Sequence, residues 1–350
     1  MLELRTLVLS LALCVVTASG RDEPRKRGDG RGAPTTTSTS LNVALVRCTP
    51  TSISVNGAAP IAAGNPIAQA LSNAGPGSTI ELAPGDYPAF AIGLDKQAPW
   101  NARISGGTAL QPIVVRATGK VRIVPQSGGD TIAIAQQFAC SNVVFEGLTI
   151  EAGYRAGIMF YKCGPNQLHD GFKFKDCEIL GGFDHLTGQG RNSKWGVWGH
   201  SLKDFEFVGA TRPAVITGLR NEHAFYLQNA KGDITIDNVQ ASRLGRTFIQ
   251  ITARPGDGEA GLGTITVRNC VVEDACIAIG DDHKGGSAFT VAGRHLGTLI
   301  FENNKYRAGF TPGIQRLTRE GVPYGTGAFV AWDGRGASNG TLILRNNDFE

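Results

Sequence analysis

The stretch NEHAFYLQN, residues 221–229, places an acid, a histidine and a tyrosine within five positions, at Glu222, His223 and Tyr226. Imidazole titrates near neutral pH and can act as a general base, while a phenol can donate a proton to a leaving oxygen. In an extended strand, alternate side chains point to opposite faces, so one strand does not turn all three groups toward one substrate. Which of them does chemistry therefore depends on the element that carries them.

A second polar cluster is GDDHKGG, residues 280–286. The adjacent carboxylates of Asp281 and Asp282 can bind calcium together with carbonyl groups and water, and Lys284 can serve as a base. The same residues are typical of an Asp/Gly turn after a strand. Both interpretations, a calcium site and a turn, stay open from the sequence.

Seven segments of the chain share one pattern, in which apolar and polar residues alternate and then break at Asn, Gly or Cys. Their first apolar residues, called markers below, are Val143, Phe172, Phe205, Ile234, Ile265, Leu299 and Leu342. The markers are spaced 29, 33, 29, 31, 34 and 43 residues apart. A strand-rich repeat of this period, with no helical pattern between repeats, favours a solenoid over two packed sandwich domains.

Each repeat also contains a second short apolar run, at 157–161, 195–200, 223–228, 247–252, 276–280 and 328–332. Each repeat is therefore expected to form one coil of two or three strands, and stacked coils form a parallel β-helix. Cys177 and Cys270 would lie three coils apart, about 14 Å, which is too far for a disulfide. We expect both thiols to be buried and free, and a bridge between Cys140 and Cys163 stays open.

The ends of a solenoid expose unpaired strand edges that must be covered. Residues 65–75 predict a capping helix, with Asn65 as N-cap, Pro66 as first helical residue and Gly75 as the stop. At the other end, GTLILRNNDFE stops in the first strand of a coil. We therefore expect that the chain is truncated there or that its last edge is exposed.

The N-terminus predicts export. Residues 1–20 contain an apolar run from Leu7 to Val16 followed by small residues, which is typical of a signal peptide and too short to span a membrane. Residues 21–40 are rich in charge, Gly, Ser and Thr and predict a disordered linker. We expect a protein that is secreted, periplasmic or at the cell surface, without a membrane span after signal removal.

The charge balance excludes one class of partner. The formal net charge is +4, and residues 21–40 carry +2 of it, from five basic and three acidic residues. The predicted β-helix of residues 41–350 is therefore only slightly basic and has no basic stripe, which argues against nucleic acid.

Alternation along the second run of each repeat predicts which side chains face outward. These are Tyr161, Trp198, Tyr226, Gln228, Gln250 and Thr252. Sugar rings stack on aromatic rings and their hydroxyls bond to amides, so this row suits an extended polysaccharide. The alternative is that loops cover Trp198 and Tyr226.

Ionisable residues flank this row. His200 or His223 can act as base, Tyr226 can protonate a leaving glycosidic oxygen, and Arg246 and Arg254 can neutralise a uronate carboxylate. The alternative is that the histidines and arginines are turn residues.

Residues 65–150 carry a family resemblance, through PGSTIELAPGDY, GGTALQPIVVRATGKVRIV and SNVVFEGLTI. They resemble the N-terminal part of right-handed β-helix polysaccharide lyases of the alginate lyase and chondroitinase B type. The resemblance implies that fold, an acidic glycan substrate and, in that family, calcium held by an Asn and acids, with a Lys base and an Arg acid. The family's NGGE and RHG segments have no counterpart here, so the resemblance assigns no site residue.

A second resemblance concerns EDACIAIGDD, residues 273–282, which is similar to the DDCIAI core of β-helix polygalacturonases. Ala275 replaces the second acid, and the GHG and RIK motifs of that family are missing. Inverting hydrolysis requires two carboxylates. A polygalacturonase-type glycoside hydrolase is therefore the third alternative.

We conclude from the sequence that this is an all-β protein, a right-handed parallel β-helix with a short N-terminal capping helix, and we expect a monomer. The favoured function is a polysaccharide lyase that cleaves a uronic-acid polymer by β-elimination, with calcium as the expected cofactor. The alternative in another class is a non-catalytic surface protein that binds carbohydrate for adhesion.

Overall fold

The computed structural model describes residues 45–93, 101–102, 104, 106–126, 129–135, 140–162, 167–253, 261–277, 288–293, 295–307, 330–333 and 340–349. The signal peptide and linker predicted for residues 1–40 lie outside these ranges. The described residues contain no helix with the length and apolar character needed to span a bilayer.

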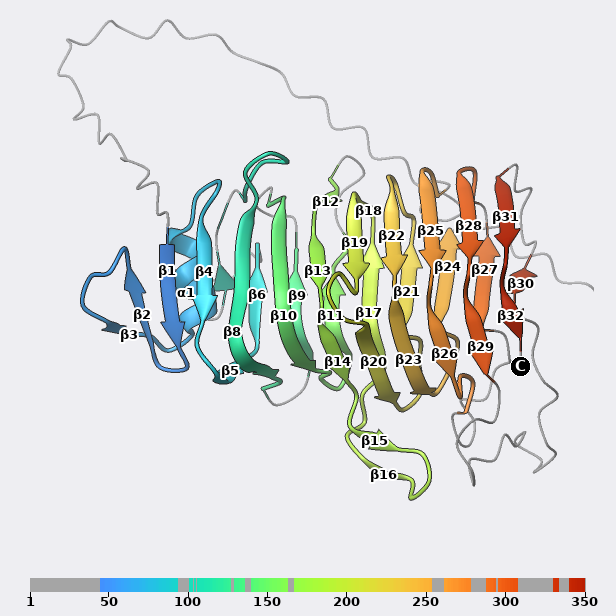
Figure 1. The fold of residues 1–350 in the computed structure, drawn as a ribbon, viewed down its shortest axis with the longest axis horizontal. Coiled ribbons are helices and arrows are strands. Elements are labelled where there is room, and N and C mark those ends of the chain that lie inside the picture. The colour runs from blue at the N-terminus through green and yellow to red at the C-terminus, as the bar shows by residue number, and fades with distance from the viewer. Residues whose placement is uncertain are drawn as a thin grey trace, which may run out of the picture. The chain divides into compact units, whose positions relative to one another are not determined.

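The chain forms a right-handed parallel β-helix, in which each coil contributes strands to three stacks (Figure 1). The marker stack runs through β1 (Leu45–Thr49), β4 (Thr79–Leu82), the first half of β8 (Ile113–Val124) and of β10 (Val143–Glu151), β13 (Lys173–Lys175), β19 (Phe205–Val208), β22 (Ile234–Asp237), β25 (Thr264–Arg268), β28 (Thr298–Glu302) and β31 (Thr341–Arg345). All these neighbours pair in parallel.

The middle stack follows after a bend in each coil. It runs through β5 (Gly85–Pro88), the second halves of β8 and β10, β14 (Glu178–Leu180), β20 (Ala214–Leu219), β23 (Val239–Leu244), β26 (Val271–Glu273), β29 (Lys305–Arg307) and β32 (Asp348–Phe349).

The third stack, here called the ledge stack, runs through β7 (Asn101–Ala102), β6 (Phe90–Ile92), β9 (Asp130–Ile134), β11 (Ala156–Phe160), β17 (Trp195–His200), β21 (Phe225–Gln228), β24 (Ile249–Ala253), β27 (Phe289–Gly293) and β30 (Val330–Asp333). Short strands outside the stacks are β2 (Ser52–Val55), β3 (Ile61–Ala62), β12 (His169–Asp170), β15 (Phe183–Asp184), β16 (Gln189–Gly190) and β18 (Leu202–Lys203).

The register confirms the predicted repeat. Phe205 pairs with Ile234, and the series continues through Ile265, Leu299 and Leu342. Val143 and Phe172 directly precede Val144 and Lys173, which pair with each other. The period-2 alternation therefore identified the coils correctly.

One predicted strand was wrong. The sequence places a ledge strand at 276–280, whereas the strand that pairs with β24 is β27, Phe289–Gly293. Asp274 and Cys276 have φ values of 52° and 61°, so the chain turns at the start of the expected strand, whose residues 278–280 lie outside the described residues. Residues in this left-handed region cannot continue an extended strand, and an apolar run next to a turn was mistaken for one.

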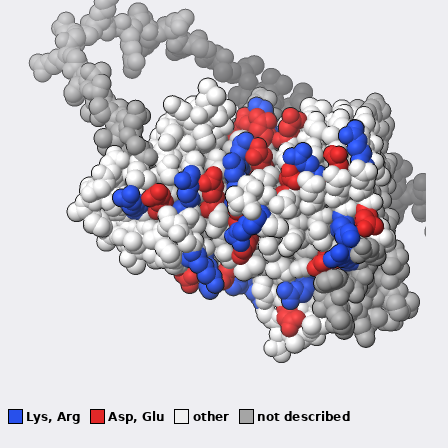
Figure 2. Space-filling view, viewed as in Figure 1, with Lys and Arg blue, Asp and Glu red and all other residues white. Residues whose placement is uncertain are grey.

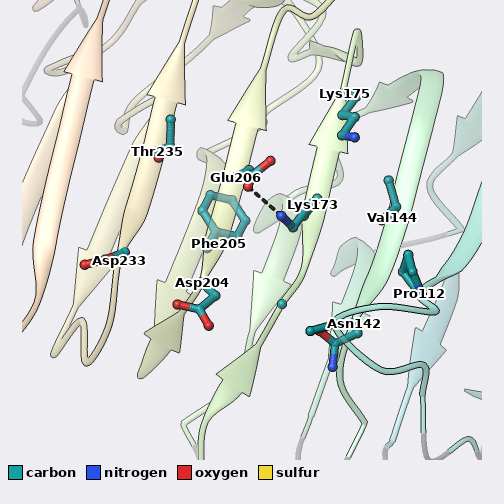
Figure 3. A pocket seen from close by; sticks show the side chains of 12 residues that line it. Pro112, Asn142, Val144, Lys173, Lys175, Asp204, Phe205, Glu206, Asp233 and Thr235 are labelled. Atoms are coloured by element: carbon teal, nitrogen blue, oxygen red, sulfur yellow. Dashed lines mark hydrogen bonds and ion pairs between the residues drawn. The ribbon is translucent and has the colours of Figure 1, made fainter.

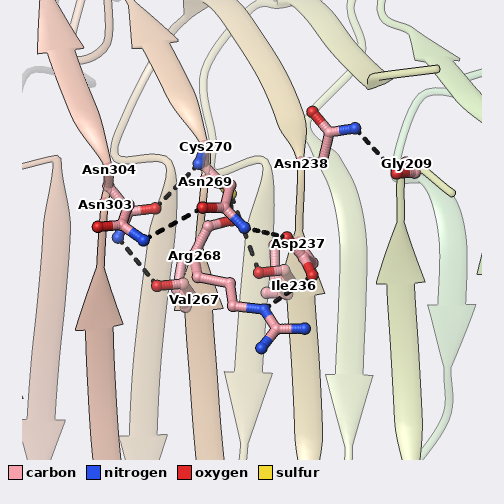
Figure 4. A network of polar contacts seen from close by, with 10 residues as sticks. All are labelled: Gly209, Ile236, Asp237, Asn238, Val267, Arg268, Asn269, Cys270, Asn303 and Asn304. Atoms are coloured by element: carbon pink, nitrogen blue, oxygen red, sulfur yellow. Dashed lines mark hydrogen bonds and ion pairs between the residues drawn. The ribbon is translucent and has the colours of Figure 1, made fainter. Parts of the chain in front are cut away.

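An asparagine corner separates the marker stack from the middle stack (Figure 4). Asn238, Asn269, Asn303 and Asn346 have φ between 49° and 55°, a conformation that Asn tolerates better than most residues. The Asn269 amide donates to Asp237 Oδ1 at 2.8 Å, and the Asn303 amide donates to Asn269 Oδ1 at 3.4 Å. These contacts join successive coils at the corner, which keeps the strand stacks in register.

Aromatic side chains fill the interior. Phe145 and Phe174 stack with centroids 4.9 Å apart, and Phe207 continues the stack 6.2 Å from Phe174. Phe207 then meets Phe225 edge to face, and Phe225 meets Phe248 in the same way. The core thus links the marker stack to the ledge stack.

The predicted capping helix is α1 (Pro66–Asn73). The Asn65 side chain accepts a hydrogen bond from the Ala68 amide at 3.1 Å and donates to the Ala89 carbonyl at 2.9 Å. The helix ends two residues before Gly75, which was predicted as the stop. Its apolar face, including Leu71, is buried, which confirms the cap.

The cysteine positions are as expected. Cys177 and Cys270 precede residues that are equivalent in register three coils apart, and both thiols are buried and free. Burial raises the pKa of each to about 12. Cys163 lies outside the described residues, so its bridge to buried Cys140 stays a prediction.

Candidate functional site

The outward positions of the ledge stack form two parallel rows, together called the ledge. One row contains Met159, Trp198, Tyr226, Gln250 and Thr290; the other contains His200, Gln228 and Thr252. Between the rows Leu227 points inward and is 1% exposed. The predicted alternation is therefore confirmed for these strands, but the expected solvent exposure is wrong for His200, Gln228 and Thr252, which are 7%, 6% and 8% exposed.

Three aromatic rings gather at the centre of the ledge. The Trp195 and Trp198 centroids are 4.5 Å apart, and the Tyr226 ring lies 5.8 Å from Trp198 and 6.3 Å from Trp195. Trp198 is half-buried, whereas Tyr226 is 8% exposed. Outward orientation therefore does not mean full exposure.

An amide connects two of these rings. The Trp198 Nε1–H donates to Gln228 Oε1 at 2.8 Å, and Gln228 Nε2 donates to the Tyr226 hydroxyl at 3.1 Å. The two hydrogen bonds fix the Tyr226 hydroxyl relative to the Trp198 ring. In the next coil Gln250 Nε2 donates to Thr252 Oγ1 at 3.2 Å.

An ion pair lies beside the aromatic rings of the ledge. Its two residues precede the strands β21 and β24. Arg246 donates to Glu222 Oε2 at 2.9 Å, and the same oxygen is 3.5 Å from His223 Nε2. The other ring nitrogen of His223 is 2.7 Å from Thr247 Oγ1. Burial, followed by the charge of Arg246, lowers the pKa of His223 to about 3. His223 is therefore neutral at neutral pH and a weak base.

His200 and Tyr161 lie toward the N-terminal coils. His200 Nδ1 is 2.8 Å from Ser201 Oγ, and the ring is 7% exposed. The Tyr161 hydroxyl donates to Asp130 Oδ2 at 3.1 Å, and Arg155 donates to both groups. Burial, and then the charge of Asp130, raises the pKa of Tyr161. Tyr161 is thus held in an ion-paired cluster.

The period-2 alternation of the sequence did not identify Trp195 and Lys194 as residues of the ledge. Alternation from inward Val197 predicts that Trp195 also points inward, but its ring packs against Trp198, with centroids 4.5 Å apart. Lys194 Nζ lies 6.0 Å from the Trp195 ring centroid. A cation therefore borders the aromatic cluster, and the spacing WGVW was the only signal for it.

Four predicted site residues lie outside the described residues: Arg254, Asp281, Asp282 and Lys284. Within the described part of the chain, no three His, Cys, Asp or Glu side chains are close enough to hold a metal ion. The ledge itself offers only neutral amides and hydroxyls as further oxygen ligands. The described residues thus do not fit a calcium site of the carboxylate-rich kind.

Two buried histidines are expected to make stability depend on pH. Burial lowers the pKa of His169 to about 4 and that of His223 to about 3, from an ordinary value of 6.5. Between pH 6.5 and 5 the unfolded chain therefore binds protons that the folded chain does not. Each histidine should lower the free energy of unfolding by about 1.4 kcal/mol per pH unit of acidification.

Urea denaturation at pH 7.5, 6.5, 5.75 and 5 measures this loss. The variant His223→Gln should lose less stability per pH unit than the unsubstituted protein. A free energy of unfolding that stays constant over this range in both proteins would contradict the burial of neutral histidines.

No family model matches the chain, and no curated protein matches it. Among solved structures, it is similar to an alginate lyase from Paenibacillus sp. str. FPU-7, with 16% identity, 87% of this chain and 97% of that chain covered, and a TM-score of 0.46. A rhamnogalacturonan lyase shows 12% identity, coverage of 78% and 80%, and a TM-score of 0.39. The A-module of the mannuronan C-5 epimerase AlgE6 from Azotobacter vinelandii shows 13% identity, coverage of 81% and 92%, and a TM-score of 0.30.

Proposed function

We propose that this protein binds an acidic polysaccharide along the ledge and cleaves it by β-elimination. The observation that carries the proposal is the cluster of Trp195, Trp198 and Tyr226, bordered by Lys194 and continued by Gln228. Rings of this kind stack on the apolar faces of sugars, amides bond to sugar hydroxyls, and a cation neutralises a carboxylate. Together they match a chain of uronic acid units.

The reaction requires three roles. A base removes the proton at C5 of the uronate, the electron pair forms the C4–C5 double bond, and the glycosidic oxygen at C4 leaves with a proton from an acid. A cation beside the carboxylate stabilises the charge that develops on it. Lys194 is suited to this third role because it borders the aromatic cluster.

Tyr226 is our candidate acid and His200 our candidate base. They lie on adjacent strands as diagonal neighbours, and diagonal neighbours in a sheet are about 7–8 Å apart, a separation that a sugar ring can bridge. Gln228 holds the Tyr226 hydroxyl through its 3.1 Å hydrogen bond. His223 is the weaker candidate base because of its lowered pKa.

Roles for the remaining predicted residues are part of the same proposal. Arg246 and Arg254 bind carboxylates of neighbouring uronate units, while Tyr161 and Gln250 extend the binding row. Asp281 and Asp282 hold calcium, and Lys284 is an alternative base. The protein is exported, secreted or held at the cell surface, and acts as a monomer on its glycan.

A non-catalytic surface protein is the second candidate. The observation that favours it is the burial of the ionisable groups: Tyr226, His200 and His223 are 8%, 7% and 4% exposed. The ledge would then bind a polysaccharide for adhesion without bringing these groups to the bond. Hydrolysis is disfavoured because Glu222, the carboxylate beside the aromatic cluster, is paired with Arg246.

The deciding experiment incubates the purified protein with alginate, pectate and chondroitin, with calcium and with a chelator. The lyase proposal predicts that ultraviolet absorbance from unsaturated uronate ends rises with at least one polymer. Binding to a polymer without any rise favours adhesion. Neither binding nor cleavage of any acidic polymer would overturn both. The chelator arm tests the proposed roles of Asp281 and Asp282.

A further inference from the structure

A row of charged side chains runs along the outer surface of the marker stack, one from each coil, and Figure 2 shows the two signs alternating across this face. In register order its members are Arg47, Glu81, Arg116, Glu146, Lys175, Val208, Asp237, Arg268, Glu302 and Arg345. Ion pairs join Arg47 to Glu81 at 3.3 Å, Arg116 to Glu146 at 3.0 Å and Arg268 to Asp237 at 2.8 Å. Val208 is the one uncharged member.

The interruption at Val208 leaves Lys175 without a carboxylate on the following coil. On the preceding coil, Glu146 already accepts from Arg116. Within the described part of the chain, no ion pair or hydrogen bond is made by the Lys175 ammonium group, whereas neighbouring Lys173 pairs with Glu206 at 2.5 Å. Lys175 is therefore an uncompensated cation within a surface whose other charges alternate.

Lys175 borders a pocket of about 350 Å³ that lies across the marker stack. Figure 3 shows Lys175 at one end of the pocket, and Asp204 and Asp233 at the other. Asn142 directly precedes β10, and Val144 forms part of the apolar wall. The pocket also contains Lys173 and Glu206, which pair with each other, so Lys175 is its one lysine without a carboxylate partner among the described residues.

The charged groups that line the pocket indicate the chemistry of the ligand that it can bind. A single carboxylate can pair with Lys175, and sugar hydroxyls can donate to the carboxylates of Asp204 and Asp233, as acidic side chains commonly accept from hydroxyls. A polyanion laid across the pocket would bring further carboxylates against these same aspartates. The volume lies in the range of sites for small ligands.

We propose that this pocket binds one sugar acid residue. The carboxylate of the sugar acid pairs with Lys175, because the next coil has the uncharged Val208 where the alternating row would have an acidic side chain. The site is separate from the ledge, since it lies on a different stack of the coil. It does not require that the ledge cleave anything. In a protein that handles acidic glycans, such a pocket would hold a uronate unit at a chain end.

Two variants test the site in opposite ways. Lys175→Gln removes the cation, and Val208→Glu supplies an internal carboxylate that competes with the ligand for Lys175. Titration calorimetry of the full chain with sodium glucuronate, glucose and acetate separates the contributions of carboxylate and hydroxyls. Glucuronate should bind more tightly than glucose or acetate, and each variant should weaken it about fivefold, the range of one exposed ion pair.

Trp198→Ala distinguishes this site from the ledge, because it should leave glucuronate binding at the pocket unchanged. The proposal is overturned if glucuronate does not bind, if it binds no better than glucose and acetate, or if both variants bind it as the unsubstituted protein does. Weakening by Trp198→Ala alone would assign the bound sugar to the ledge and also overturn the pocket.

Discussion

Tyr226→Phe is expected to lower kcat/KM for the cleaved uronic-acid polymer by about 10²- to 10⁴-fold, the range for removal of a positioned acid or base. The substitution keeps the ring that contacts Trp195 and Trp198 but removes the hydroxyl that accepts from Gln228. Because stacking is preserved, KM should change less than kcat. Initial rates of unsaturated product formation over a range of polymer concentrations measure both constants.

A matched control is Tyr154→Phe, which removes the hydroxyl of an exposed tyrosine and keeps the ring that Lys194 contacts, with Nζ 5.1 Å from the ring centroid. It should leave kcat and KM within twofold of the unsubstituted values. Equal cleavage rates for Tyr226→Phe and the unsubstituted protein would remove Tyr226 from the mechanism and leave His200 or Lys284 to be tested next.

Phe174→Ala is expected to lower the free energy of unfolding by about 3–5 kcal/mol, the usual cost of truncating a buried phenylalanine. Its side chain is fully buried between Phe145 and Phe207, one coil before and one coil after. Deleting the ring removes contacts with two coils at once, and the parallel strands around it limit how far the cavity can collapse. Equilibrium denaturation in guanidinium chloride measures the loss.

Two further variants serve as controls for the stability loss of Phe174→Ala. Phe174→Leu should lose less stability because it fills part of the cavity, and Thr266→Ala, on the outer surface of β25, should change stability by less than about 0.5 kcal/mol. A loss at Phe174→Ala no larger than that at Thr266→Ala would contradict the aromatic stack as a source of stability.

The coils could be predicted from the sequence because each strand follows a rule with a short range. Alternation placed Leu227 inward and Trp198 outward, and Asn marked corners where φ is positive. Asn65 and Pro66 gave the start of the cap for the same reason, since capping uses residues within one turn. The strand expected at 276–280 was misplaced because apolar composition does not reveal the positive φ of Asp274 and Cys276 at its start.

The ledge could be predicted only in part. The two rows of the ledge follow from the strand period, but the hydrogen bonds and ion pairs among its side chains join different coils. The pairing of Arg246 with Glu222 spans 24 residues, and the hydrogen bond from Trp198 to Gln228 spans 30. The spacing of residues within one coil cannot reveal such pairs. The outward direction of Tyr226 also overestimated its exposure, which is 8%.

The central claim is that the aromatic ledge is the polysaccharide site, and the affinity of Trp198→Ala for the bound polymer tests it most directly. Calorimetric titration should show affinity about 30-fold weaker than that of the unsubstituted protein, the scale expected for removing a central aromatic contact. Trp198→Phe should recover part of the loss. Equal affinity in Trp198→Ala and the unsubstituted protein would place the polysaccharide elsewhere and contradict the account.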